Sequence, residues 1–173
     1  MPVNIGRRQA MELVLLRHAK AEEDSAALPD ERRELVPKGR KRALAVARGL
    51  ERLLPADGRV EVWTSPALRA RPTADIIADY LDAATVKEHA AIYAGSLESL
   101  IAEWAGAAEE RTVIVVGHEP YLGIWARQLA DVTLPFKKCA AAGFTLAAPD
   151  FATGALRWFA GPKVLSSLGD NKD

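Results

Sequence analysis

The chain has 173 residues, of which 49% are apolar and 27% charged, so it can form one globular domain with a core, and disorder over the whole chain is excluded. Lys and Arg together number 23, as do Asp and Glu, and the resulting net charge of zero lacks the basic excess of a non-specific nucleic-acid binder. A single cysteine, Cys139, excludes an internal disulfide and a cysteine-rich zinc site.

The apolar runs of the chain are short. The longest, Leu13–Leu16 and Val113–Val116, fall far below the roughly 20 residues that cross a bilayer. Residues 1–10 contain too brief an apolar stretch for a secretory signal and predict a disordered extension. We therefore expect a soluble, cytoplasmic protein that binds neither nucleic acid nor membrane.

The first half of the chain alternates strand and helix patterns. Leu13–Leu16 is a continuous apolar run, as in a strand buried on both faces of a sheet. The charged segment Glu22–Glu34 then predicts a solvated, mobile loop. From Lys38 to Leu54, apolar residues recur at three- and four-residue steps, which predicts a helix. The short, β-branched run Val60–Trp63 predicts the next strand.

The same alternation continues beyond this point. Pro72–Leu81 predicts a helix, because proline suits the first helical turn. Thr85–Glu88 is a weaker strand pattern, and Ser96–Trp104 predicts a helix with Ser96 as its N-cap. Val113–Val116 is a second strand of the fully buried type.

The end of the chain differs. Gly143–Ala148 and Ala155–Ala160 flank a run of turn residues and predict a hairpin. Together the elements predict a three-layer α/β/α sandwich whose central sheet is mostly parallel, with antiparallel hairpin strands at an edge. We expect one domain over residues 11–165 and a polar, solvated tail over residues 166–173.

Polar side chains follow three of the predicted strands at the point where each ends. Arg17 and His18 follow the first strand, Arg69 follows the second within Thr64–Arg69, and His118 follows the strand that ends at Val116. Ligands of open α/β sheets bind beyond the carboxyl ends of the strands. Each residue alone is ordinary, but their recurrence at equivalent strand ends predicts one site.

The residue types at this edge point to phosphoryl chemistry. Guanidinium groups bind phosphoryl oxygens through paired, charge-assisted hydrogen bonds, so Arg17 and Arg69 predict a phosphate site. A neutral imidazole beside them can attack phosphorus and form a covalent phosphohistidine. A second imidazole can donate a hydrogen bond to a phosphoryl oxygen as charge develops.

Three ordered motifs resemble those of the histidine phosphatase superfamily, which has the phosphoglycerate mutase-like fold: Leu-Arg-His at 16–18, Thr-Ser-Pro-Ala-Leu-Arg-Ala at 64–70 and Val-Gly-His-Glu-Pro at 116–120. The short length and the late Trp158 are similar to the SixA-type phosphohistidine phosphatases. The resemblance covers residues 11–165. It implies that His18 is the nucleophile, that Arg17 and Arg69 bind the phosphoryl oxygens, and that His118 stabilises them.

Three positions depart from the family pattern. Ala19 stands where many members have glycine after the nucleophile, so no positive φ is expected there. Arg71 and Pro72 replace a more common pair and should only move the start of the helix. The proton donor is not fixed by any motif: Glu88 and Glu119 are the two candidates, and we hypothesise that a phosphohistidine substrate needs no strong acid.

Other residues that invite a functional interpretation have plainer ones. The basic run Lys38–Arg42 lacks the spacing of a phosphate-binding loop and predicts a solvated helix start. Arg71 could reach the substrate or form an external salt bridge, and we expect His89 to be structural or exposed. Lys138 could line the rim of the site. Since the histidines lack metal-ligand spacing, we expect chemistry without a metal or cofactor.

Three functions compete on this sequence. The first is a phosphatase that acts on phosphohistidine of a protein, since a short chain should lack a lid that encloses a metabolite. The second is a phosphatase of a small phosphoester or nucleotide, which would need an acid near the leaving group. The third is a phosphate-binding module without turnover. The oligomeric state is left open.

Overall fold

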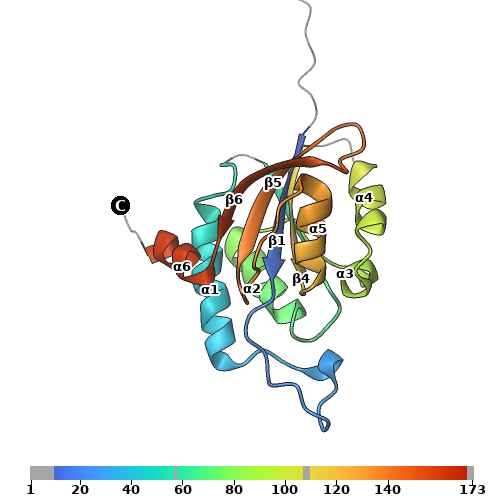
Figure 1. Cartoon of the computed structure of the whole chain (residues 1–173). Coiled ribbons are helices and arrows are strands. Elements are labelled where there is room, and N and C mark those ends of the chain that lie inside the picture. The colour runs from blue at the N-terminus through green and yellow to red at the C-terminus, as the bar shows by residue number, and fades with distance from the viewer. Residues whose placement is uncertain (1–9, 57, 107–109, 171–173) are drawn as a thin grey trace, which may run out of the picture.

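The protein is built on one six-stranded sheet. A computed structural model describes residues 10–56, 58–106 and 110–170 (Figure 1). The strand order is β3-β2-β4-β1-β5-β6. In chain order the strands are β1 (Ala10–Arg17), β2 (Arg59–Thr64), β3 (Thr85–Glu88), β4 (Arg111–Gly117), β5 (Ala141–Ala147) and β6 (Gly154–Ala160). Each strand predicted from the sequence is confirmed within a few residues.

The sheet is mixed in the way the sequence predicts. β1, β2, β3 and β4 pair in parallel, while β5 pairs antiparallel with β1 and β6 pairs antiparallel with β5. β6 forms the edge, whereas β5 lies inside the sheet between β1 and β6. The predicted fold class, a mostly parallel sheet with an antiparallel C-terminal hairpin, is confirmed.

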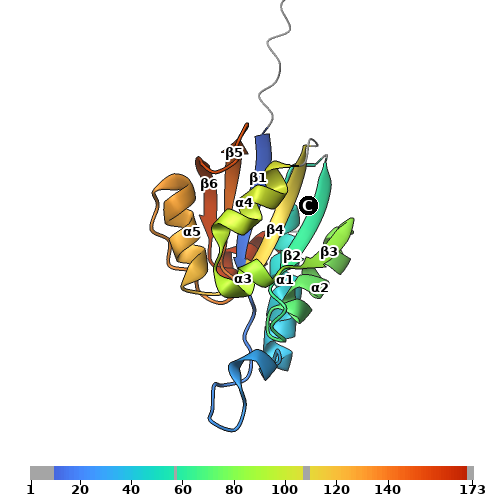
Figure 2. The same ribbon diagram turned by 90° about the vertical axis from the view of Figure 1, so that its right-hand side faces the viewer.

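Six α-helices among the described residues cover the two faces of this sheet (Figures 1 and 2). Side chains alternate between the faces along β1: Leu13 and Leu15 enter one core cluster, and Val14 and Leu16 enter the other. Helices α4 (Leu97–Ala105) and α5 (Tyr121–Ala130), with the short α3 (Ala90–Ala94), contribute to the first cluster. Helices α1 (Pro37–Glu51), α2 (Arg71–Leu81) and α6 (Pro162–Asp170) contribute to the second.

Most helix boundaries agree with the sequence patterns. α1 begins at Pro37 and ends at Glu51, and α4 has Ser96 as its N-cap, with the hydroxyl accepting from the Ser99 N–H at 3.3 Å. The sequence analysis did not assign α5, although Leu122, Trp125 and Leu129 recur at helical spacing and are buried. None of the helices in the described ranges is long and apolar enough to span a membrane.

The predicted ends of the domain need one correction. Ser166–Asp170 is not a solvated tail, because it is the second half of α6, which packs on α1. Leu165 is fully buried, and the hydroxyls of Ser166 and Ser167 donate to carbonyls one turn back, so the serines do not oppose the helix. At the other end, Ala10 already belongs to β1. Residues 1–9 and 171–173, also predicted to be disordered, lie outside the described residues.

The packing of α6 on α1 depends on Gly49. An added Cβ there would lie 1.9 Å from the carbonyl oxygen of Leu165. Gly49→Ala should therefore lower the free energy of unfolding by about 1–3 kcal/mol, although the same change in an open helix stabilises by about 1 kcal/mol. Urea denaturation measures it. Gly106→Ala is the control, because its Cβ would meet nothing closer than 3.7 Å. If Gly49→Ala were as stable as wild type or more stable, the close packing of α6 on α1 at Gly49 would be contradicted.

Candidate active site

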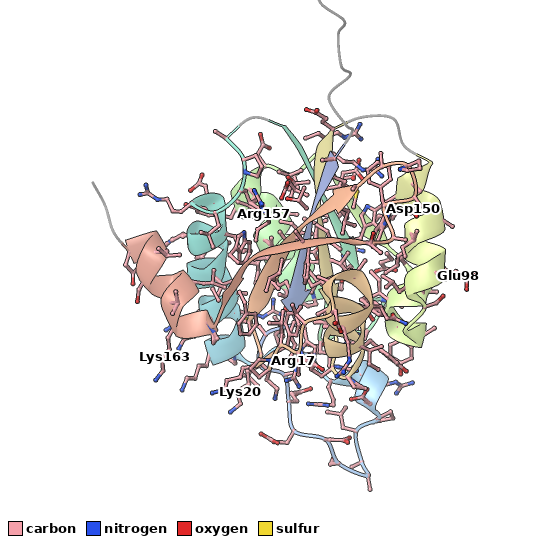
Figure 3. All side chains as sticks on the ribbon, turned by 45° about the horizontal axis from the view of Figure 1, so that its top comes forward. Arg17, Lys20, Glu98, Asp150, Arg157 and Lys163 are labelled. Carbon is pink, nitrogen blue, oxygen red and sulfur yellow. The ribbon has the colours of Figure 1, made fainter. Side chains whose placement is uncertain are left out.

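The structure brings the predicted site residues together at one end of the sheet. The carboxyl ends of β1 and β4 are joined where the His18 N–H donates to the carbonyl of Gly117 at 3.1 Å. The rings of His18 and His118 lie 5.2 Å apart between centroids, and both are buried. Arg17 and Arg69 interact electrostatically with both rings. Figure 3 shows Arg17 at this end and Asp150 at the opposite end of the molecule.

His18 is held in one tautomer. Its Nδ1 lies 2.7 Å from the carbonyl oxygen of Ala19, and because a carbonyl only accepts, Nδ1 carries the proton. The lone pair of the neutral ring is then on Nε2. The pKa of His18 is lowered to about 3, mainly by burial, which outweighs the opposing hydrogen bond to Ala19, with smaller contributions from His118, Arg69 and Arg17. At neutral pH the ring is therefore uncharged.

Thr73 fixes the backbone that follows His18. The N–H of Ala19 donates to the Thr73 hydroxyl at 3.0 Å, and that hydroxyl donates to the Arg69 carbonyl at 3.5 Å. Thr73 is fully buried in the first turns of α2, which begins at Arg71. Ala19 is not among the non-glycine residues with a positive φ, so alanine is unstrained here. The sequence analysis assigned no role to Thr73, since only the fold places it beside Ala19.

His118 is the second imidazole of the site. Both of its ring nitrogens are buried and have no hydrogen-bond partner among the described residues. Burial lowers its pKa to about 4, followed by the charges on Arg69 and Arg17, and Asp30 acts in the opposite direction. Buried polar nitrogens normally have a partner, so this ring is arranged to receive one from a bound group.

The two arginines belong to different parts of the chain: Arg17 is the last residue of β1, and Arg69 lies just before α2. Nη1 of Arg17 donates to the carbonyl of Phe136 at 2.8 Å, while its Nε is buried and unpartnered in the described structure. Arg69 donates from Nη1 to the Asp30 carbonyl, and its Nη2 lies 2.6 Å from the Asp30 carboxylate. Both guanidinium groups are therefore held in place, while the Nε donor of Arg17 has no partner among the described residues.

Asp30 belongs to the loop Glu22–Glu34, which the sequence analysis expected to be solvated and mobile. Most of the loop is exposed, as expected, but a short 3-10 helix (Asp30–Arg32) carries Asp30, and the Asp30 carboxylate pairs with Arg69. Arg33 also pairs with Asp30 at 2.8 Å. The i,i+3 spacing of Asp30 and Arg33 was visible in the sequence, but the distant partner Arg69 was not.

The two carboxylates considered as proton donors occupy different surroundings. Glu88 is about half exposed and pairs with Arg71 at 2.7 Å. One carboxyl oxygen of Glu119 is buried without a partner in the described residues. Burial raises the pKa of Glu119, against the lowering effects of Arg17 and of the Gly123 N–H. Gly123 leaves room for this carboxylate, since a Cβ there would lie 3.2 Å from it.

The remaining candidates have structural explanations. Arg71 is held by Asp75 and Glu88, so the external salt bridge is confirmed. The His89 ring caps α3 by accepting from the Ala91 N–H and also bonds Glu103, as expected of a structural histidine.

Two further groups lie apart from the phosphoryl chemistry. Burial raises the pKa of the Cys139 thiol to about 12, which leaves it protonated at neutral pH. In the run Lys38–Arg42, the side chains of Lys38, Arg40 and Lys41 are exposed on α1, as predicted. No group of three or more His, Cys, Asp or Glu side chains within the described ranges is placed to hold a metal ion.

Comparisons with known proteins agree with this geometry. The family model described as histidine phosphatase superfamily (branch 1) matches residues 13–93. An uncharacterized protein of Picosynechococcus sp. is 37% identical over 129 residues, which cover 69% of this chain and 73% of that protein.

Solved structures with the same fold include several phosphatases. A proposed phosphohistidine phosphatase SixA from Nakamurella multipartitia is 29% identical with a TM-score of 0.71, over 88% of this chain and 96% of that one. The protein histidine phosphatase SixA complexed with tungstate is 24% identical with a TM-score of 0.70, over 90% and 99%. A mycobacterial glucosyl-3-phosphoglycerate phosphatase is 19% identical with a TM-score of 0.66, over 88% and 100%.

The protonation of the site can be measured directly, because the chain has three histidines. Nitrogen-15 imidazole spectra should show His18 neutral, with the proton on Nδ1, from pH 7 down to about 5, since its pKa is lowered to about 3. His118, lowered to about 4, should also stay neutral. Titration of His18 near 6.5, or a proton on Nε2, would contradict the assignment.

The same shifts fix the sign of the pH dependence of stability. The unfolded histidines take up protons near pH 6.5, whereas the folded rings do so near 3 and 4. The stability that these rings contribute is thus complete above about 6.5 and is lost as the pH falls from there toward 4. Measuring the free energy of unfolding across this pH range therefore gives an independent check on the spectra.

Proposed function

The chain belongs to the histidine phosphatase superfamily, and on this basis we propose that it removes the phosphoryl group from phosphohistidine on a protein through a phosphorylated His18. The observation that carries the proposal is the hydrogen bond from Nδ1 of His18 to the Ala19 carbonyl. It leaves the Nε2 lone pair of a neutral, buried imidazole beside a second imidazole and two guanidinium groups.

The reaction proceeds in two displacements. Nε2 of His18 attacks phosphorus, the bond from phosphorus to the substrate nitrogen breaks with its electron pair staying on that nitrogen, and the leaving imidazole takes up a proton from water. Arg17 and Arg69 hold the phosphoryl oxygens, and His118 donates to one of them as negative charge develops. Phosphorylation draws electrons from the His18 ring, and the Nδ1–H bond to Ala19 stabilises it. Water then attacks phosphorus, releases phosphate and restores the Nε2 lone pair.

A protein substrate is supported by the side chains that flank the site. Leu68, next to Arg69, is 43% exposed, and Tyr93, whose ring lies edge-on to His118 at 6.0 Å, is 37% exposed. Apolar side chains exposed beside a charged site suit contact with another protein surface. The likeness to the SixA structure from Nakamurella multipartitia agrees with this substrate class. The cytoplasmic location remains a prediction.

Phosphate release from a phosphohistidine protein, measured in a metal chelator, tests the proposal. The wild-type chain should release phosphate, and His18→Ala should be slower by roughly 10³-fold or more, because the variant lacks the imidazole that is proposed to become phosphorylated. His89→Ala is the matched control, since its ring caps α3 instead. Phosphate binding without turnover by the wild-type chain would leave only the binding module.

Hydrolysis of small phosphoesters is the second candidate, and Glu119 is the observation that favours it. A carboxyl group whose pKa is raised by burial is suited to protonate an alkoxide leaving group, which an imidazole leaving group does not require. The orphaned oxygen of Glu119 supplies such a group near Arg17.

Glu119→Gln separates the two candidates. If esters are the substrate, the variant should lose about a hundredfold in ester turnover, as expected for removal of a general acid. If phosphohistidine is the substrate, its release from the phosphoprotein should change little. Glu88→Gln is the control, because Glu88 is occupied by Arg71. Parallel rates on a phosphohistidine protein and an ester panel give the comparison, and ester turnover that survives in Glu119→Gln excludes Glu119 as the acid.

A further inference from the structure

In the structure, Arg69 is already paired with a carboxylate of the protein itself, that of Asp30. The Asp30 carboxylate lies 2.6 Å from its Nη2, and the Asp30 carbonyl accepts from its Nη1 at 2.6 Å. The same carboxylate interacts electrostatically with His118. Asp30 therefore places a negative oxygen beside two of the groups that the proposed function assigns to a phosphoryl group.

The loop that carries Asp30 is closed on itself. Glu22 and Glu34 bond each other twice, through the Glu22 N–H to the Glu34 carbonyl and the Glu34 N–H to the Glu22 carboxylate. Arg33 donates from Nε to the Glu22 carbonyl at 2.7 Å and from Nη1 to Asp30 at 2.8 Å. These bonds tie the two ends of the loop together and link Arg33 to Asp30, which in turn contacts Arg69.

Two like charges compete for the same guanidinium. A phosphoryl dianion that reaches Arg69 and His118 meets the Asp30 carboxylate at close range, where repulsion between anions is strong. Arg33 gives the carboxylate a second partner, so Asp30 can leave Arg69 without becoming an unpaired charge. The side chain of Asp30 is 43% exposed, which leaves it room to turn outward.

We propose that the Asp30 carboxylate occupies Arg69 in the free protein in place of a phosphoryl oxygen, and that the phosphoryl group displaces it onto Arg33. The proposal rests on the proposed role of Arg69 in binding that group. Asp30 is then a positioning residue: it holds Arg69 ready in the empty site and, on displacement of its carboxylate, leaves the loop attached to Arg69 only through the Asp30 carbonyl. Product phosphate leaves as the carboxylate returns, so Asp30 weakens phosphate binding and favours release.

Calorimetric binding of inorganic phosphate to four forms of the full chain tests this. Asp30→Asn keeps a neutral acceptor for Arg69 but removes the charge, and should bind phosphate roughly three- to tenfold more tightly than wild type, as expected for the loss of a partly exposed ion pair. Asp75→Asn is the matched control, because it removes a carboxylate from Arg71 while Glu88 still holds that arginine. Its affinity should equal that of wild type.

The fourth form, Arg69→Met, separates the two proposals. It should bind phosphate at least tenfold more weakly. If Arg69→Met loses affinity but Asp30→Asn binds no more tightly than wild type, the displacement is wrong and the phosphate role of Arg69 stands. If Arg69→Met binds as well as wild type, or if no form binds, both proposals fail.

A measurement on the wild-type chain avoids any folding defect of the variants. Amide hydrogen exchange of residues 22–34 should become faster when phosphate is added, because the loop loses its side-chain anchor on Arg69. Slower or unchanged exchange in this segment would show that phosphate binds with Asp30 in place, and would overturn the displacement.

Discussion

The parallel pairing of β1 with β4 is the constraint on which the site depends. Its register sets Leu13 opposite Val113 and Arg17 opposite Gly117, so both strands end at the same level. The next residue of each strand is a histidine, and the His18 N–H bonds to Gly117 across the junction. A slip of one residue would move every side chain of β1 to the other face, exchanging the two core clusters that β1 separates. The hydrophobic core therefore enforces the spacing of the two imidazoles.

Burial sets the protonation state of the two imidazoles. The largest cause of the low pKa of both rings is the loss of water, and the arginines add to it. The arginines proposed to bind a phosphoryl group also help to keep the histidines neutral, so one arrangement would serve both proposed roles. The Ala19 carbonyl then selects which nitrogen holds the lone pair. That carbonyl is placed by the bond from the Ala19 N–H to Thr73, so α2 takes part in the site from the opposite side of the nucleophile.

Charge balance at the site is local. Arg69 is opposed by Asp30 and Arg17 interacts with Glu119, each within a chain of zero net charge. Without these carboxylates, two guanidinium groups would lie near each other in partly buried surroundings, at a cost in desolvation and repulsion. A phosphoryl group replaces part of that compensation when it binds. The empty and occupied sites can therefore both be stable in the same fold.

The sequence by itself determined the fold class, the strands, the helices other than α3, α5 and α6, and the shared strand-end location of Arg17, His18, Arg69 and His118. These follow from local patterns: apolar runs, helical periodicity and the residues directly after each strand. It did not determine α6, whose serines suggest a solvated tail until their hydroxyls are seen to bond the helix carbonyls.

Contacts between distant segments were decided only by the tertiary structure. Asp30 on Arg69 and Thr73 on Ala19 join residues 39 and 54 positions apart. The difference between Glu88 and Glu119 likewise depends on burial and on neighbours from other elements. No local sequence pattern indicates such long-range contacts. Their hydrogen bonds and desolvation exist only once the chain has folded around them.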